Sequence, residues 1–402
     1  MSIEIRAIRA EEFSVSAVPI THYFPVPADN FLERFAAHVP ADRLHAAFDN
    51  GAIVGSGAAF PFEMSVPGGF VRAAGVTLVG VLPTHRRRGV FRAVMQAQLV
   101  DVHERGEPIA YLWASDDALY GRFGYGIASF SGTIEVPRDR AAFYREFGST
   151  GVVRLVDVEE AIEPFSTIQR RAAARHPGMF VRTPEWWRSR RLADPEWARA
   201  GGGELKRALL ELEGRPAAYA LYRLHFSAER GIPRGFTNVI EAVGDSPEAT
   251  RAIWRYVLDI DWMERVRADL LPLDHELFML LREPRRLHFN YRDGLWVRLV
   301  DIEAALNART YKTGEPVTVE VADELCEWNA GVWALGPEGA APSTGEPELR
   351  FDVSALGSVY LGGFTFGELA RAGRVEVLVD GALDRADTLF RADRYPWCPE
   401  IF

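Results

Sequence analysis

The order of apolar and polar residues near the start of the chain predicts a strand, a helix and a hairpin. Residues 3–8 alternate with the two-residue period of a half-buried strand, and residues 31–37 have helical periodicity. Two further strand patterns, 44–48 and 53–60, lie on either side of Asp49-Asn50-Gly51. Because Asn-Gly adopts tight hairpin turns readily, these two strands are expected to pair.

The next stretch predicts a buried strand that leads into a helix. Residues 73–82 are almost all apolar and rich in β-branched side chains, and the run stops at Pro83. Helical periodicity follows over 88–104, and another strand pattern lies at 109–114. The first third of the chain therefore reads as an α/β domain.

The segment 152–281 repeats this order in a weaker form. It contains, in sequence, strand 152–156, helix 161–174, hairpin strands 205–212 and 217–224, strand 236–243, helix 246–258 and strand 277–281. Its turn Gly244-Asp245-Ser246-Pro247 offers a helix cap but no arginine-rich loop for an anion. We expect a duplicated α/β domain whose second copy does not bind a cofactor.

The remaining residues change character and predict a small α+β domain, with a loop rich in Gly, Pro and Ala over 336–346. A chain of 402 residues is too long for one ordinary core. We expect three domains, over residues 1–148, 149–287 and 288–402.

Composition narrows the function classes. The net charge of -10 works against binding to a nucleic-acid backbone. The sequence has no run of about 18 apolar residues and no signal peptide, so a cytoplasmic protein without a membrane span is expected. The two cysteines, Cys326 and Cys398, are expected to be free and packed, and no His/Cys/Asp/Glu spacing suggests a metal site.

The strongest chemical signal is the turn after residues 76–82. Pro83 ends the strand, Arg86-Arg87-Arg88-Gly89 follows, and a helix then begins. Such a turn points backbone N–H groups and the positive helix end at one place, where a pyrophosphate could bind. An ordinary turn with solvated arginines is the alternative.

These residues resemble a known family. Arg86-x-x-Gly89-x-Phe91 is similar to the pyrophosphate loop of GNAT N-acetyltransferases, although Phe91 replaces the usual Gly or Ala. Together with residues 120–126, Trp186-Trp187, residues 295–298 and the C-terminal end, the loop resembles the Eis (enhanced intracellular survival) family over essentially the whole chain. The resemblance implies two GNAT domains, the second degenerate, and a domain like sterol carrier protein. It also implies hexamers that acetylate aminoglycosides or lysine side chains.

The resemblance implies acetyl-CoA as co-substrate and a set of residues that bind it. The expected cofactor residues are Val79, Gly80, Val81, Arg86, Arg87, Arg88, Gly89, Val90, Phe91, Arg92 and Ser115. Phe24 and Glu400 are expected to contact the cationic amine substrate. A polyamine is a further candidate for this substrate. Strand 76–81 is expected to pair with the pantetheine arm by strand addition.

Direct transfer to an amine needs a base and a proton donor for the departing thiolate. Tyr125 is the expected donor, with space for cofactor beside Gly124 and Gly126; packing at a turn is the alternative. His85 is more simply a phosphate- or solvent-facing side chain than a base. The family resemblance implies that the α-carboxylate of Phe402 is the base, acting through water.

A rival hypothesis is a protein that binds acyl-CoA or an apolar ligand without turnover. Its ligand would lie among Phe351, Val359, Tyr360, Leu361, Phe364 and Phe366, although such a cluster is more often core.

Overall fold

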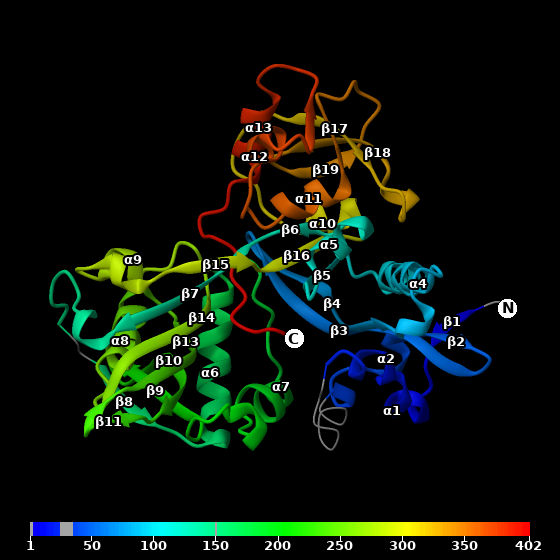
Figure 1. Cartoon of the computed structure of the whole chain (residues 1–402). Helices are drawn as coiled ribbons and strands as arrows, with labels where there is room; N and C mark the ends of the chain where they lie inside the picture. Colours follow the sequence, from blue (N-terminus) through cyan, green and yellow to red (C-terminus); the bar gives the residue numbers. More distant parts are fainter. Residues whose placement is uncertain (1–2, 25–34, 149–150) are drawn as a thin grey trace. The chain divides into compact units, whose positions relative to one another are not determined.

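The computed structural model describes residues 3–24, 35–148 and 151–402. They form two compact units (Figure 1). The first contains Met1–Ser129, Gly294–Pro396 and Ile401–Phe402, and the second contains Phe130–Asp293 and Trp397–Glu400. The helix expected over 31–37 falls mostly outside the described residues. No described helix is long and apolar enough to cross a membrane.

The first unit is built on a seven-stranded sheet. Its order is β1 (Glu4–Ala7), β2 (Leu44–Asp49), β3 (Ala52–Val66), β4 (Gly69–Val81), β5 (Ile109–Trp113), β16 (Leu295–Leu299) and β6 (Gly126–Ile127). Strands β2 and β3 form the expected hairpin, and Asn50 and Gly51 both adopt positive φ at its turn. Only β4 and β5 are parallel neighbours, joined by helix α4 (Val90–Glu104).

Helices cover both faces of this sheet. The apolar side of α4, including Val94, Met95 and Leu99, packs against alternate residues of β3 to β5. The short helices α1 (Phe13–Ser16) and α2 (Val18–Thr21) pack against β3 on the other face, where α2 also meets β4. Because helices cover both faces of the sheet, side chains that point to either face are buried. This explains why residues 73–82 are almost all apolar.

A second sheet of the first unit forms the small α+β domain. Its order is β19 (Gly339–Pro342), β18 (Gly331–Gly336), β17 (Val317–Ala322), β20 (Leu349–Asp352) and β21 (Val375–Val377), and its helices are α10 (Ile302–Asn307), α11 (Val353–Val359), α12 (Phe366–Arg371) and α13 (Ala382–Phe390). Helix α11 packs on β16 and β6. The small domain and the first sheet therefore share one core.

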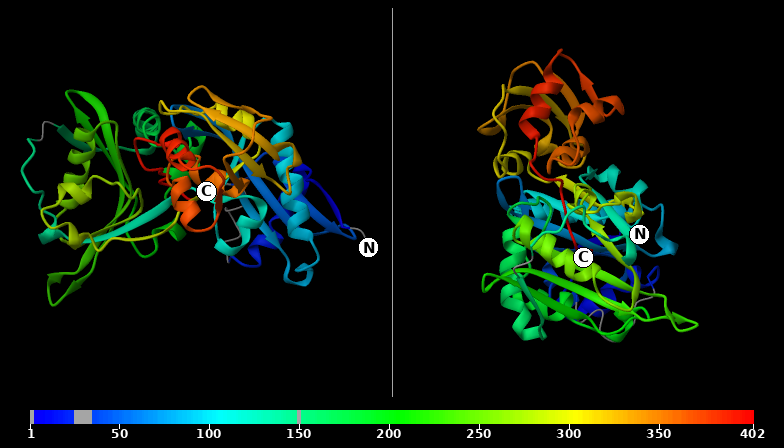
Figure 2. Two further views of the ribbon diagram at one scale, coloured as in Figure 1. Left: turned by 90° about the horizontal axis from the view of Figure 1, so that it is seen from above. Right: turned by 90° about the vertical axis from the view of Figure 1, so that its left-hand side faces the viewer.

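The second unit contains another seven-stranded sheet. Its order is β15 (Asn290–Asp293), β7 (Phe130–Pro137), β14 (Met263–Leu271), β13 (Gly235–Gly244), β10 (Arg215–His225), β9 (Lys206–Leu212) and β8 (Gly151–Leu155). Helix α8 (Pro247–Leu258) packs against Ala218 and Ala220, whereas Phe165 of α6 (Val158–Ala173) stacks on Tyr219. The two helices thus cover opposite faces (Figure 2).

Three strands lie in sheets other than their sequence position suggests, and the shortest displacement is that of β15, which falls within the expected third domain but pairs with β7 in the second sheet. β7 falls within the expected first domain, 1–148, but pairs with β14 and β15 in the second sheet. β16 falls within the expected third domain, 288–402, but pairs with β5 and β6 in the first sheet. The units accordingly divide after Ser129 and after Asp293.

We predict that neither cysteine reacts with Ellman's reagent in the native protein. Both thiols are free and buried, as expected from the sequence, and burial raises the pKa of Cys326 to about 11 and that of Cys398 to about 12. Because the thiolate is the reactive form, both should be silent at pH 8 and titrate fully in guanidinium chloride. Glutathione provides the positive control, and rapid release of two equivalents from the native protein would contradict the prediction.

Candidate active site

The site begins where β4 separates from β5. Their parallel ladder runs from Ala73 paired with Ile109 to Gly75 paired with Tyr111 and then stops. Residues 78 and 79 of β4 stand opposite Gly57 alone, and Leu78 has φ +52°. This β-bulge bends β4 away, so residues 76–81 keep β3 as a partner on one edge only. The other edge, along the expected cofactor residues Val79, Gly80 and Val81, has no strand partner among the described residues and can accept an extended ligand, except that the carbonyl of Val81 already accepts from the hydroxyl of Tyr23.

An uncapped helix end follows this free edge. Gly89 begins α4 with φ +80°, and no side chain caps the helix. The first bond within the helix runs from the N–H of Ala93 to the carbonyl of Gly89, 3.0 Å away. The amides of Val90, Phe91 and Arg92 therefore precede the helical bonding pattern and can serve an anion.

The arginines around this helix end differ in their hydrogen-bond and ion-pair partners. Arg86 Nε donates to the hydroxyl of Tyr23 at 3.0 Å, and that hydroxyl donates to the carbonyl of Val81 at 2.8 Å. Arg88 reaches Asp49 at 3.5 Å. Arg87 and Arg92 are exposed and have no ion-pair partner within the described part of the chain. Their charges remain available to a phosphate.

Phe91 and His85, two residues of this loop with several possible roles in the sequence, both make contacts within the protein. The ring of Phe91 lies 5.2 Å from that of Phe123 and 6.3 Å from that of Tyr120, so it packs into the domain and leaves the helix end open. His85 lies 3.1 Å from Asp49 and 2.8 Å from the hydroxyl of Thr84. These contacts make His85 part of the turn.

The structure brings Ser115 together with a tyrosine that the sequence reasoning passed over. Ser115 is exposed just after β5, and helix α5 (Asp117–Tyr120) follows it. Tyr120 is 5% exposed and its hydroxyl forms a hydrogen bond with Ser115. Burial raises the pKa of Tyr120, and this hydrogen bond opposes the shift. Through this hydrogen bond Tyr120, although buried, contacts an exposed residue that is expected to bind the cofactor.

Tyr125 lies deeper than expected. It is 0% exposed, and its hydroxyl has no hydrogen-bond partner among the described residues. Burial raises its pKa, and Arg298 opposes this. The space beside Gly124 is filled by Arg298 and Val353, and a side chain at Gly126 would overlap the carbonyl of Ser354. The expectation that these glycines leave room for cofactor is therefore wrong, because protein atoms occupy that room.

The chain end lies at the point where β4 and β5 part. The hydroxyl of Thr77 donates to a terminal oxygen of Phe402 at 3.4 Å. The Phe402 ring packs against Tyr111 and Phe62, with centroid distances of 4.9 and 5.2 Å. A Cβ added to Gly75 would lie 3.3 Å from this ring. Thr77 was missed in the sequence because a hydroxyl on a buried strand carries no signal until its partner is known.

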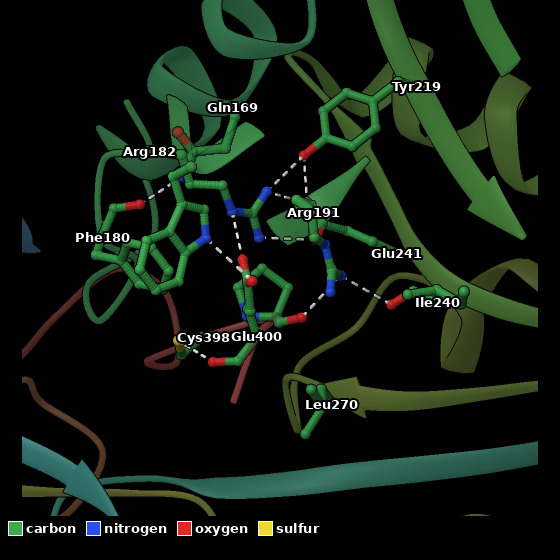
Figure 3. Close-up of polar contacts among 12 residues, drawn as sticks. Gln169, Phe180, Arg182, Arg191, Tyr219, Ile240, Glu241, Leu270, Cys398 and Glu400 are labelled. Atoms are coloured by element: carbon green, nitrogen blue, oxygen red, sulfur yellow. Dashed lines mark hydrogen bonds and ion pairs between the residues drawn. The ribbon is translucent and has the colours of Figure 1, made fainter. Parts of the chain in front are cut away.

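The two expected substrate residues differ in environment. Phe24 is 48% exposed and follows Tyr23, which is bonded to β4. Glu400 is buried, and its carboxylate accepts hydrogen bonds from Arg182 Nε at 2.7 Å and Trp186 Nε1 at 3.1 Å (Figure 3). Its charge is thus already balanced inside the second unit.

The equivalent turn in the second unit is closed to anions. Ser246 caps α8 by accepting from the N–H of Ala249. Asp245 precedes it and pairs with Arg215 at 2.8 Å and Arg171 at 3.1 Å. A capped helix beside a buried carboxylate would repel a phosphate.

Comparison with known proteins agrees with this geometry. Residues 4–128 match the model of an acetyltransferase (GNAT) domain, residues 178–299 match another acetyltransferase (GNAT) domain, and residues 302–399 match a sterol carrier protein domain. Fold and matches together define an N-acetyltransferase of the GNAT class, which transfers an acetyl group to an amine. GNAT acetyltransferases take this group from acetyl-CoA.

More specifically, the chain belongs to the Eis family of these enzymes. It is 34% identical over 354 residues to N-acetyltransferase Eis of Mycobacterium tuberculosis, covering 85% of this chain and 84% of the relative. It is also similar to the crystal structure of Eis1 from Mycobacterium abscessus, with a TM-score of 0.87 and 34% identity over 99% of this chain and 100% of that one. An uncharacterized N-acetyltransferase of Streptomyces avermitilis is 36% identical over 410 residues and the full length of both chains.

We predict that Gly89→Trp abolishes acetyl-CoA binding while the protein stays folded. The bulky side chain would stand over the amides of residues 90–92, and φ +80° is unfavourable for it. Gly214→Trp is the matched control, because Gly214 has φ +75° and equally open surroundings in the second unit. Calorimetric titration checks this, and equal affinity in the two variants would refute the assignment of the loop.

Proposed function

We propose that acetyl-CoA binds in an extended form along the free edge of β4, with its pyrophosphate at the start of α4. The observation that carries this proposal is the continuity of an unpaired strand edge with an uncapped helix end and two uncommitted arginines. Val79, Gly80 and Val81 would bond the pantetheine amides. The amides of residues 90–92, with Arg87 and Arg92, would hold the phosphates, and Arg86 and Arg88 add positive potential.

The reaction is a direct transfer within a ternary complex. The amine loses a proton, its nitrogen forms a bond to the acetyl carbonyl carbon, and the carbon–sulfur bond breaks. We assign the base to the α-carboxylate of Phe402, which takes the proton through water because a carboxylate alone is a weak base for an ammonium group. Thr77 holds this carboxylate where β4 and β5 part.

The thiolate of coenzyme A then needs a proton. We assign its donor to Tyr120 in place of Tyr125, since Tyr120 bonds to exposed Ser115 whereas Tyr125 is enclosed by protein. The phenol O–H bond breaks, the S–H bond forms, and the phenolate regains a proton from solvent. A phenol is neutral at pH 7 and can therefore act as this acid.

The acceptor we propose is a small polycationic amine, such as an aminoglycoside, a polyamine or a lysine side chain. The net charge of -10 favours a cation, and exposed Phe24 offers an aromatic surface to it. The family resemblance further supports a cytoplasmic hexamer.

The rival hypothesis of an apolar-ligand protein has less support. Phe351, Val359, Tyr360, Leu361 and Phe366 are each at most 5% exposed. The ring of Phe366 packs at 5.4 Å from Phe351 and 5.1 Å from Phe390. With Phe364 partly buried beside them, these side chains form a packed core.

We predict that Tyr120→Phe lowers kcat by about 10²-fold or more while acetyl-CoA binding is kept, the usual scale for a general acid. Tyr125→Phe is the matched comparison and should change kcat little, because it removes a buried hydroxyl that has no partner among the described residues. Turnover is followed by release of the coenzyme A thiol. The reverse order of the two variants would return the role to Tyr125.

We predict that one or two alanines appended after Phe402 lower kcat by about 10²-fold, because they move the carboxylate without removing a side chain. Appending the same residues to the N-terminus is the control. Full turnover of the extended enzyme, with an unchanged melting temperature, would rule out the terminal carboxylate as base.

A further inference from the structure

The second unit contains a buried polar cluster that holds the tail of the chain. We call it the tail socket and define it by Arg182, Trp186, Arg191, Tyr219 and Glu241 (Figure 3). Its members come from the segment around α7 (Pro184–Trp186) and from the neighbouring strands β10 and β13.

The base of the socket is a fixed network. The side chain of Arg182 is 1% exposed and donates to both oxygens of Glu241, at 2.8 Å each. Arg191 and the Tyr219 hydroxyl also bond to Glu241. Burial opposes the charge of Glu241, but the two arginines outweigh it and lower its pKa. The carboxylate is therefore ionised and sets the direction of Arg182.

The tail occupies the open side of this network. Glu400 binds Arg182 and Trp186, and the carbonyl of Pro399 accepts from Arg191 at 3.1 Å. Trp397 donates its backbone N–H to Pro177 at 2.7 Å and its indole N–H to Leu270 at 2.6 Å. Four consecutive tail residues, Trp397–Glu400, thus belong to the second unit.

The negative charge of Glu400 is the contribution of the tail that balances the charges of the socket. The socket holds two cations, Arg182 and Arg191, and one anion, Glu241. Burial raises the pKa of Tyr219, which stays neutral. Glu400 supplies the second negative charge, and a buried cation left without one is strongly unfavourable. No apolar tail residue could replace this contribution.

Resting on the proposed function, we propose that Glu400 is a positioning residue for the terminal carboxylate, and that its contact with the tail socket sets where that base stands. Only Ile401 separates Glu400 from Phe402, so a fixed Glu400 confines the Cα atom of Phe402, which carries the carboxylate, to within about 7 Å of the Cα atom of Glu400. This role replaces the substrate contact expected for Glu400. Misplacement of a reacting group by about 1 Å can cost about 10²-fold in rate.

A double-mutant cycle on the full-length enzyme tests this. Glu400→Gln keeps the shape of the side chain and removes its charge, and one alanine appended after Phe402 displaces the base. We expect each change alone to lower kcat by about 10²-fold, with little change in the KM for acetyl-CoA. We expect the double variant to be no slower than the extended enzyme alone, since a displaced base no longer needs its anchor.

Glu159→Gln is the matched control, because Glu159 pairs with Arg188 in the same unit but is exposed. Trp186→Phe removes a single donor to Glu400 and gives a milder test if Glu400→Gln does not fold; it should lower kcat several-fold.

The outcomes separate the two proposals. Full turnover of the extended enzyme removes the base of the proposed function and overturns this inference with it. A slow extended enzyme beside a fully active Glu400→Gln variant overturns this inference alone. If the reductions in kcat of the two single variants multiply in the double variant, Glu400 acts independently of the terminal carboxylate, and this inference is overturned. A loss of acetyl-CoA affinity in Glu400→Gln would overturn it as well.

Discussion

The active site depends on one backbone irregularity, the bulge at Leu78 and Val79. Left-handed backbone at a residue such as Leu78 costs about 1–3 kcal/mol, and the pairing of β4 with β3 on both sides of the bulge holds it in place. Without the bulge, β4 could continue alongside Leu112 and Trp113, the last residues of β5, and their main chain would fill the start of this edge. The same separation opens the place where Thr77 meets the terminal carboxylate. The proposed cofactor edge and the proposed base therefore lie beside a single local distortion.

The interleaving of strands makes the small C-terminal domain part of the same core. β16 carries Arg298, which is fully buried and donates to Asp323 at 2.6 Å. Asp323 also accepts from the backbone of Leu325 and Cys326, so the ion pair fastens the small domain to the first sheet. Breaking such a buried pair costs about 3–5 kcal/mol. The domain that resembles a sterol carrier protein thus helps to hold Arg298, which packs against Gly124 next to Tyr125.

Local signals in the sequence identified most elements near the site, but the pattern at 277–281, expected as a strand, forms helix α9 (Leu277–Leu280). The hairpin at Asn50 and the turn at Gly89 follow from neighbouring residues, and both were predicted. The positions of β7 and β16 depend on pairing between distant segments, which alternation along the chain does not specify. The same limit applies to Gly124: a glycine indicates a close approach, but the sequence could not show that Arg298, rather than a ligand, makes it. Likewise, Arg182 lies too far from Glu400 in sequence for the pair to be recognised.

The energetics of the tail explain why burial of the terminal phenylalanine ring alone cannot hold the carboxylate that we propose as the base. Ordering the chain costs about 1–2 kcal/mol for each residue of the tail, and Pro399 reduces this only at its own position. Burying the Phe402 ring returns about 1.5–3 kcal/mol, which offsets the ordering of at most about three residues. The segment from Trp397 onward therefore needs further contacts, and the described structure supplies them at Trp397, Pro399 and Glu400. The charge of Glu400 contributes most specificity, because the tail socket accepts an anion there and leaves a buried arginine unbalanced without it. The base that we propose at the chain end therefore depends on the contacts of the residue two positions before it.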